Sequence, residues 1–330
     1  MRTKLRLTVC IVALLVTTPA WSQTVLRIQD YPGLGNFLVR VANANGLCEK
    51  HGVKCDLRII PQASLGLQAL LARDIEVAHA PPEVLIQATS KGADLKVVGS
   101  SLRMPPFFLI ASTSLATPNA VKGYPAVMQD FKGKRIGIAA RGTATEFQLI
   151  DFLKGAGLKA EDVTLLAVGA PNTALPAITN GQIDGLMLYS PMDGFCEVNN
   201  VCRVVVDPRK GEGPADVLNT AGAAVVFVVR GDFAVKNSAA LDGFSRAMRE
   251  AEALLKNPAN FAAMLKVAQD TFKITTPNGD QVLAISLRNN LPTYGFELDP
   301  KAMQHIAEYM HRTGQIDKLV DTGKLLLSKP

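Results

Sequence analysis

The feature that most constrains the fold is a pattern of strands, loops and helices that occurs twice with the same spacing. Three strand-like runs in each half have central residues that lie 29 and then 18 positions apart. These residues are Ile28, Leu57 and Ile75 in the first half, and Ile136, Leu165 and Ile183 in the second. Helical patterns separate the runs, as in parallel α/β sheets. The spacing predicts two similar α/β units, and a chance match between two ordinary units is the alternative.

The loops that follow these strands indicate where a ligand binds. In open α/β sheets, ligands bind in the crevice outside the carboxyl ends of the strands. If the two units face one another, six such loops converge on one cleft. Further strand-like runs at 96–101, 107–111 and 223–229 predict that the chain crosses between the units twice. We expect one lobe to contain residues 23–112 and 223–330, and a second lobe to contain residues 113–222.

The first 22 residues have the pattern of a secretory signal peptide. Arg2, Lys4 and Arg6 precede the apolar run 7–16, and small residues follow before Gln23. A membrane anchor is the alternative, but a spanning helix needs about 20 apolar residues. No later segment has that length and apolar content. The sequence therefore predicts a secreted protein that is cleaved near Ser22/Gln23.

The charge of the mature chain is mild. Removal of residues 1–22 takes away three basic residues and no acids, which changes the formal net charge from +6 to +3. A nucleic-acid interface is typically marked by basic runs interleaved with aromatic residues, and the sequence contains no such run. We therefore expect no nucleic-acid partner, and only a weak preference for anionic solutes.

Four cysteines remain after the signal segment. Export implies an oxidising compartment, in which cysteines form disulfides. Four cysteines allow three connectivities, and the short separations favour Cys48–Cys55 and Cys196–Cys202. A zinc site is disfavoured because neither pair has the spacing of a zinc motif.

The junction at 137–153 combines an apolar strand with a helix start. Gly142 allows close approach of a ligand to the backbone, and the free N–H groups of a first helical turn attract anions. Thr143 and Glu146 form a capping-box pattern. Two interpretations therefore stand: an ordinary helix cap, or a polar-group site. Arg141 is either a ligand contact or a solvated loop residue.

The candidate ligand-binding residues are those at the loop tips. They offer hydroxyl, amide and aromatic groups but no reactive constellation, and packing is the alternative role for the tyrosines and prolines. They are Tyr31, Gly33, Leu34, Gly35, Ser64, Pro81, Pro82, Met104, Arg141, Gly142, Thr143, Thr145, Asn172, Tyr189 and Ser190. We expect no catalytic residue, no metal and no cofactor.

Several stretches resemble one family of transport proteins. They are FKGKRIG at 131–137, RGTAT at 141–145, LKGAGLKAED at 153–162, AITNGQIDG at 177–185 and LLARDIEV at 70–77. The chain resembles the periplasmic solute-binding proteins of ABC importers, in the branch of sulfonate, taurine, nitrate and thiamine-pyrimidine-like receptors. The resemblance implies a two-lobed α/β fold of type II, with mixed sheets, a hinge of two crossings and a ligand cleft between the lobes.

The function expected from this resemblance is binding rather than catalysis. We expect a monomer that captures a small organic ligand, anionic or aromatic, and delivers it to the membrane permease of an ABC importer. An enzyme related to thiamine-pyrimidine synthases is one alternative. It would need a reactive His–Lys and iron constellation that the sequence does not present. A periplasmic sensory receptor is the other alternative.

Overall fold

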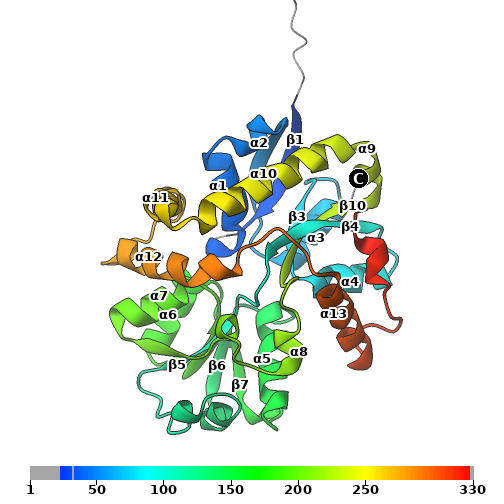
Figure 1. The fold of residues 1–330 in the computed structure, drawn as a ribbon. Coiled ribbons are helices and arrows are strands. Elements are labelled where there is room, and N and C mark those ends of the chain that lie inside the picture. The colour runs from blue at the N-terminus through cyan, green and yellow to red at the C-terminus, as the bar shows by residue number, and fades with distance from the viewer. Residues whose placement is uncertain (1–22, 32, 328–330) are drawn as a thin grey trace, which may run out of the picture.

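The structure is a computed structural model that describes residues 23–31 and 33–327, so the predicted signal segment lies outside the described residues. Two α/β lobes lie end to end, with the N-terminal lobe at the top of Figure 1. The first lobe contains the strands β1 (Thr24–Asp30), β2 (Val53–Ile59), β3 (Ala78–Ala80), β4 (Leu95–Leu102) and β10 (Val225–Arg230). The second contains β5 (Phe108–Ser112), β6 (Arg135–Ile138), β7 (Thr164–Ala167), β8 (Gly185–Leu188) and β9 (Cys202–Val206).

The two lobes have equivalent mixed sheets. The second-lobe sheet has the order β7-β6-β8-β5-β9. The first lobe has the order β2-β1 and β3-β10-β4, and the two parts meet at a parallel bridge between Ile28 and Val77. In each lobe the strand next to one edge, β10 or β5, runs antiparallel to its neighbours. The predicted α/β fold with mixed sheets is therefore confirmed.

The register of the strands repeats with the sequence spacing. Ile28 pairs with Leu57, and Ile136, 108 positions later, pairs with Leu165. An ion pair repeats at the same offset. The Arg27 guanidinium binds Glu76 and donates to the Arg73 carbonyl, and the Arg135 guanidinium binds Asp184 and donates to the Gly181 carbonyl. Equivalent strands thus end at equivalent places, which directs the loops of both lobes toward the gap between them.

The sheet pairings correct the expected position of the first crossing. The sequence predicts the strand at 107–111 in the first lobe, with the crossing after it. Instead β5 pairs with β8 and β9, so the chain enters the second lobe between Leu102 and Phe108. The return crossing lies between β9 and β10, within residues 207–224. The first crossing therefore leads into β5 and the return crossing leads into β10. Each of these strands runs antiparallel to its neighbours in the lobe that the chain enters.

Helices cover both sheets, and one of them joins the lobes. The first-lobe helices are α1 (Phe37–Ala44), α2 (Leu47–Lys50), α3 (Ala63–Leu71), α4 (Pro82–Ser90), α9 (Gly231–Lys236), α10 (Ser238–Lys256), α11 (Phe261–Thr271) and α13 (Pro300–Arg312). The second-lobe helices are α5 (Ala144–Gly155), α6 (Pro171–Thr179), α7 (Met192–Asn199) and α8 (Ala215–Leu218). Helix α12 (Gly279–Asn290) lies between the lobes in Figure 1.

Helix α12 packs on both lobes. Val282 belongs to a core cluster of the second lobe, whereas Leu283 and Leu287 belong to the large core of the first. No helix of the described residues is both long enough and apolar enough to cross a bilayer.

One disulfide lies in each lobe. Cys48 is bonded to Cys55 and Cys196 to Cys202, as the short separations predict. The first bond ties α2 to β2 and the second ties α7 to β9. Each bond closes a short loop and so restricts the unfolded chain.

Candidate functional site

A cavity of about 340 Å³, the central cavity, lies between the lobes at the ends of their strands. Most of the candidate residues from the sequence line it: Tyr31, Leu34, Gly35, Ser64, Pro81, Gly142, Thr143, Thr145, Tyr189 and Ser190. Sequence reasoning missed other lining residues, including Gln62, Phe107, Ala139, Ala140, Gly169, Ala170 and Asn290. Several of these are neighbours of the chosen residues in the same loops, so the loop position was their only signal.

The other candidates lie outside the lining of this cavity. Gly33 has φ +121° and stands against the ring of Tyr189, where it shapes the wall. Pro82 is the buried first residue of α4. Met104 and Asn172 do not line the central cavity. These positions shape or flank the loops rather than face the central space.

The start of α5 is held by contacts other than an ordinary cap. Thr143 is the N-cap residue, but its hydroxyl makes no capping bond and donates to the Ala140 carbonyl at 2.7 Å. Glu146 accepts from the Gly142 N–H at 2.6 Å, one residue earlier than in the predicted capping box. Arg141 binds Glu146 and the Leu165 carbonyl and lines no part of the cavity. The helix start therefore has no side-chain cap, and its residues Thr143, Ala144 and Thr145 line the cavity.

Gln29 fixes the first-lobe wall. Its side-chain amide donates to the carbonyls of Ile60 and Gln62 and accepts from the His79 N–H. A Cβ on Gly66 would lie 1.8 Å from Gln29 Oε1, so a side chain at position 66 would displace the Gln29 amide from these hydrogen bonds. These bonds set the loop that carries Gln62 against the end of β3.

His79 is a buried neutral group at the floor of the central cavity. Its side chain is 2% exposed, and burial lowers its pKa to about 3. Its Nε2 atom is hydrogen-bonded to the Ser101 hydroxyl, whereas its Nδ1 atom has no hydrogen-bond partner among the described residues. Tyr31 packs edge-on against the imidazole ring and donates to the His79 carbonyl at 2.6 Å. His79 thus contributes a polar but uncharged atom to the site.

The wall beside α12 is a closed polar network. Ser190 and Asn290 line the cavity and are hydrogen-bonded to each other. Behind them, the buried Arg209 guanidinium lies 2.9 Å from both Asp193 and Asp207. The Asp193 carboxylate also accepts from the Ser286 hydroxyl of α12. These groups satisfy one another and fix the position of α12 against α7.

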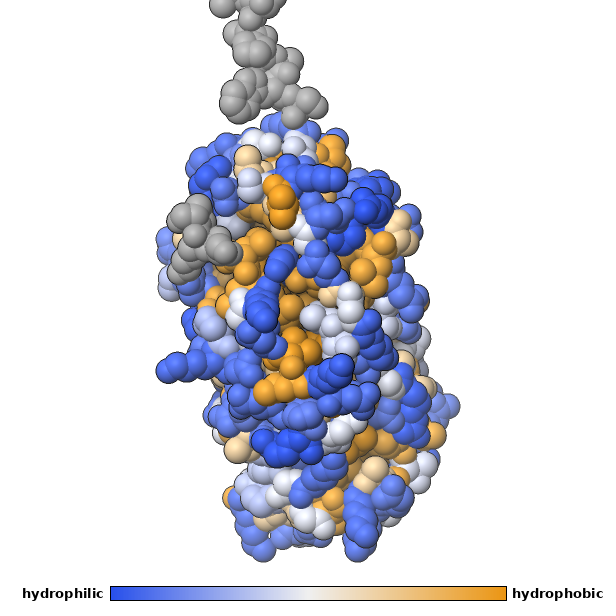
Figure 2. Space-filling view, turned by 90° about the vertical axis from the view of Figure 1, so that its right-hand side faces the viewer, coloured by the Kyte–Doolittle hydropathy of each residue, from blue (hydrophilic) through white to orange (hydrophobic). Residues whose placement is uncertain are grey.

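A second cavity of about 270 Å³, the side cavity, adjoins the central one and shares Pro81, Val84 and Phe107 with it. It lies between α4 and α13 of the first lobe and α5 and α8 of the second. Figure 2 shows apolar residues gathered in the middle of this face of the molecule, between more hydrophilic surfaces. Sequence reasoning missed its polar lining: Glu83, Gln87, Gln148, Asp151, Asp216, Thr220, Tyr309 and Gln315.

The side cavity contains two carboxyl groups in an unfavourable environment. Burial raises the pKa of Glu83 to about 7, and the nearby charge of Asp151 adds to the effect. Burial likewise raises the pKa of Asp151 to about 6, although a hydrogen bond from Tyr309 acts in the opposite direction. No lysine or arginine is among the described residues that line either cavity. The combined space is therefore largely apolar, with carboxyl and other acceptor groups in its lining.

This arrangement can bind and enclose a small molecule. The described residues contain no group of three or more His, Cys, Asp or Glu that could hold a metal ion. The polar atoms of the central cavity are backbone amides, hydroxyls and a neutral imidazole, which suit hydrogen bonding. A cleft lined by both lobes at a two-crossing junction is suited to closure around a ligand.

Comparison with known proteins agrees with this geometry. The NMT1/THI5-like family matches residues 37–261. A putative binding protein of Brucella abortus (strain 2308) is 26% identical over 268 residues, which is 79% of this chain and 76% of the relative. The taurine-binding periplasmic protein of Escherichia coli (strain K12) is 24% identical over 69% of both chains. A putative thiamine biosynthesis protein of Haemophilus influenzae is 25% identical over 96% of both.

Solved structures with the same fold include two binding proteins. The alkanesulfonate-binding protein SsuA of Xanthomonas axonopodis pv. citri has a TM-score of 0.71 and 22% identity, over 92% of this chain and 98% of that one. The periplasmic aliphatic sulphonate binding protein SsuA of Escherichia coli has a TM-score of 0.72 and 22% identity, over 94% of both. The fold is thus the two-lobed fold of periplasmic binding proteins, and the chain belongs to the NMT1/THI5-like family.

Proposed function

We propose that this protein is an extracytoplasmic solute-binding protein that captures a small organic ligand between its lobes and delivers it to an ABC importer. The observation that carries the proposal is the central cavity, because loops from the strand ends of both lobes line it. The binding proteins among its relatives support the same class of function. A periplasmic location and the predicted signal segment belong to the proposal.

The lining favours an aromatic or largely apolar ligand over a strongly anionic one. Tyr31, Leu34, Phe107 and Tyr189 supply apolar and aromatic walls. An anion would have no lysine or arginine partner among the described lining residues, and would depend on backbone amides such as those that begin α5. Burial raises the pKa of Tyr189 to about 12, so its hydroxyl remains a neutral donor for a ligand.

The Haemophilus relative supports a second candidate, an enzyme that acts on a pyrimidine-like compound. Native mass spectrometry of freshly purified protein separates the two candidates. A small molecule that is retained, released by denaturation and recovered unchanged after incubation supports the binding protein. Conversion of that molecule to a product supports the enzyme. Purified protein that carries no ligand and gains no thermal stability from periplasmic extract would contradict the proposed function.

Two variants test the location of the site. Tyr189→Ala should weaken binding of the recovered ligand about tenfold or more, because it removes an aromatic wall of the central cavity. Asn172→Ala is the control, since Asn172 lies in an equivalent loop but lines neither cavity. Isothermal titration calorimetry measures both affinities. Equal affinities for the two variants would place the ligand elsewhere.

A further inference from the structure

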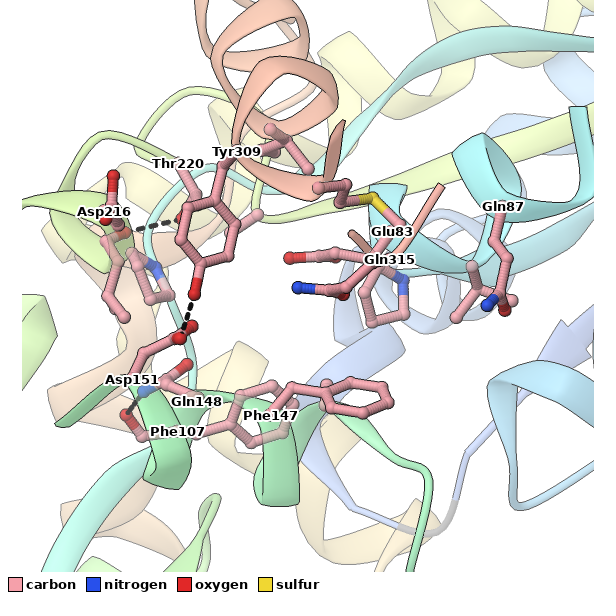
Figure 3. A pocket seen from close by; sticks show the side chains of 18 of the residues that line it. Glu83, Gln87, Phe107, Phe147, Gln148, Asp151, Asp216, Thr220, Tyr309 and Gln315 are labelled. Carbon is pink, nitrogen blue, oxygen red and sulfur yellow. Dashed lines mark hydrogen bonds between the residues drawn. The ribbon is translucent and has the colours of Figure 1, made fainter. Parts of the chain in front are cut away.

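The side cavity carries an inference about the chemical class of the ligand, and this inference rests on the proposed function. Because the two cavities share walls, a ligand in the central cavity can extend one group into the side cavity. In Figure 3, Asp151 and Tyr309 lie on one side of this space, with Glu83 and Gln315 across from them and Phe147 below. The acidic groups come from both lobes.

Glu83 is an acceptor without a partner. Its Oε2 atom is buried and has no hydrogen-bond partner among the described residues. A buried carboxylate oxygen without a hydrogen bond or a cation is costly. Burial raises the pKa of Glu83 because the buried negative charge is unfavourable. A ligand group that donates hydrogen bonds and carries positive charge would offset this free-energy cost.

Asp151 faces the same space from the other lobe. Tyr309 donates to its Oδ1 atom, and Asp151 forms no ion pair within the described residues. Asp216, at the edge of the cavity, differs because Arg312 lies 3.0 Å from its carboxylate. The protein thus pairs the outer acid with its own arginine. The two inner acids form no ion pair within the described residues, although the charge of Lys154 acts on Asp151.

The central cavity also has a hydrogen-bond acceptor without a donor. The Ser101 hydroxyl donates to the Val225 carbonyl at 3.4 Å, so it accepts from the Nε2–H of His79. In that tautomer the enclosed, unpartnered Nδ1 atom of His79 is a hydrogen-bond acceptor. A buried acceptor without a partner is rare in native structures. Glu83 Oε2 at the side cavity and His79 Nδ1 at the central cavity are therefore both acceptors that lack a hydrogen-bond donor among the described residues.

We propose that the side cavity binds the cationic nitrogen group of an organic ligand, a protonated amine, between Glu83 and Asp151, while the apolar body of the ligand fills the central cavity. The rings of Phe107, Phe147 and Tyr309 line the side cavity and favour an organic cation through their π faces. Gln148 and Gln315 supply further polar contacts at the walls. Closure of the lobes brings the two acids together around the charge.

The test uses three probes that share one phenyl body and differ in their head group: phenethylammonium, phenethyl alcohol and hydrocinnamate. Calorimetry at about pH 8, where both acids are ionised, should give at least tenfold tighter binding of the ammonium than of the alcohol, and the weakest binding for the carboxylate. The double variant Glu83→Gln/Asp151→Asn should lose this preference for the ammonium. Its affinity for the alcohol should change less than about twofold.

A matched control removes the same charge elsewhere. Glu161→Gln/Asp280→Asn changes two exposed acids that line neither cavity, and should keep the preference. Ammonium binding that is no tighter than alcohol binding in the wild type overturns the inference, as does a preference that survives in the double variant. If no probe binds, the cation site is rejected, whereas the proposed function is decided separately by the ligand retained in native mass spectrometry.

Discussion

The two sides of the junction between the lobes, along α12 and along α13, differ in how their acidic side chains are paired. On the α12 side, Arg209 neutralises Asp193 and Asp207, and Ser286 and Asn289 donate to Asp193. On the α13 side, Glu83 and Asp151 face a cavity without a cation between them. On the α12 side the buried carboxylates are paired and closely packed, whereas on the α13 side two carboxyl groups line a cavity.

This difference assigns separate roles to the two sides. A buried ion network loses much of its stabilisation when one member moves, so it holds α12 and α7 in one arrangement. Two acids without a counterion favour a state in which water or a ligand reaches them. The lobes are therefore joined by a buried polar network along α12. Along α13 they are joined by bonds from Tyr309 to Asp151 and from Arg312 to Asp216, which border the side cavity.

The largest expected effect is at Arg209. Arg209→Met leaves two buried carboxylates without a cation, and should lower the free energy of unfolding by about 3 to 5 kcal/mol. It also removes the guanidinium that lies 4.3 Å above the ring of Phe108. Urea unfolding followed by circular dichroism measures the change. Lys266→Met, which breaks an exposed pair with Asp270, is the control and should leave the midpoint unchanged. A similar midpoint for both variants would contradict the claim that the Arg209 network stabilises the α12 side of the junction.

The second effect is a pH dependence from the α13 side. Burial raises the pKa values of Glu83 and Asp151 above those of the unfolded chain, so the folded state binds more protons between about pH 4 and 7. Their contribution to stability is present below this window and is lost as the pH rises through it. The loss should be on the order of 3 kcal/mol for each acid. Tyr309, Lys154 and Asp216 also act on Asp151, and His305 and Arg312 in turn pair with Asp216.

The double variant Glu83→Gln/Asp151→Asn isolates this dependence. It carries no titrating group at the two positions, so its stability relative to the wild type should increase from about pH 5 to pH 8. Thermal unfolding of both proteins across this range measures the difference. A constant difference over the whole range would show that the two acids titrate as they do in the unfolded chain.

The smallest effect compares single hydroxyl groups on the two sides. Ser286→Ala removes a donor to the enclosed Asp193 carboxylate, and should cost about 1 to 3 kcal/mol. Tyr309→Phe removes a donor to Asp151, where water in the cavity can replace it, and should cost less than about 1 kcal/mol. Urea midpoints measure both variants. A larger loss for Tyr309→Phe would reverse the comparison.

The sequence predicted the repeated units because strand and helix periods are local signals. Ile28 and Ile136 pair with residues at the same offset, as the equal spacing indicates. The first crossing was placed incorrectly, because β5 is a short run that is buried on every residue. Such a run has no alternation to indicate which sheet it joins. Its antiparallel pairing with β8 and β9 is decided only by three-dimensional contact.

The central cavity could be predicted in outline because it follows the ends of strands. The side cavity could not, since Asp151 and Tyr309 are 158 positions apart and meet only where α5 and α13 pack. Glu83 has the sequence context of an ordinary acidic residue in the first turn of a helix. Its enclosure depends on side chains from the opposite lobe.

Local patterns in the sequence predicted two α/β halves, their matching register and the loops that face the gap, and favoured the disulfide pairs that the structure contains. These follow from periodicity and short separations, which act over a few residues. Tertiary structure alone decided which side of the gap is packed and which is hollow. That choice depends on how distant helices bury or expose charge, and no local pattern of residues encodes it.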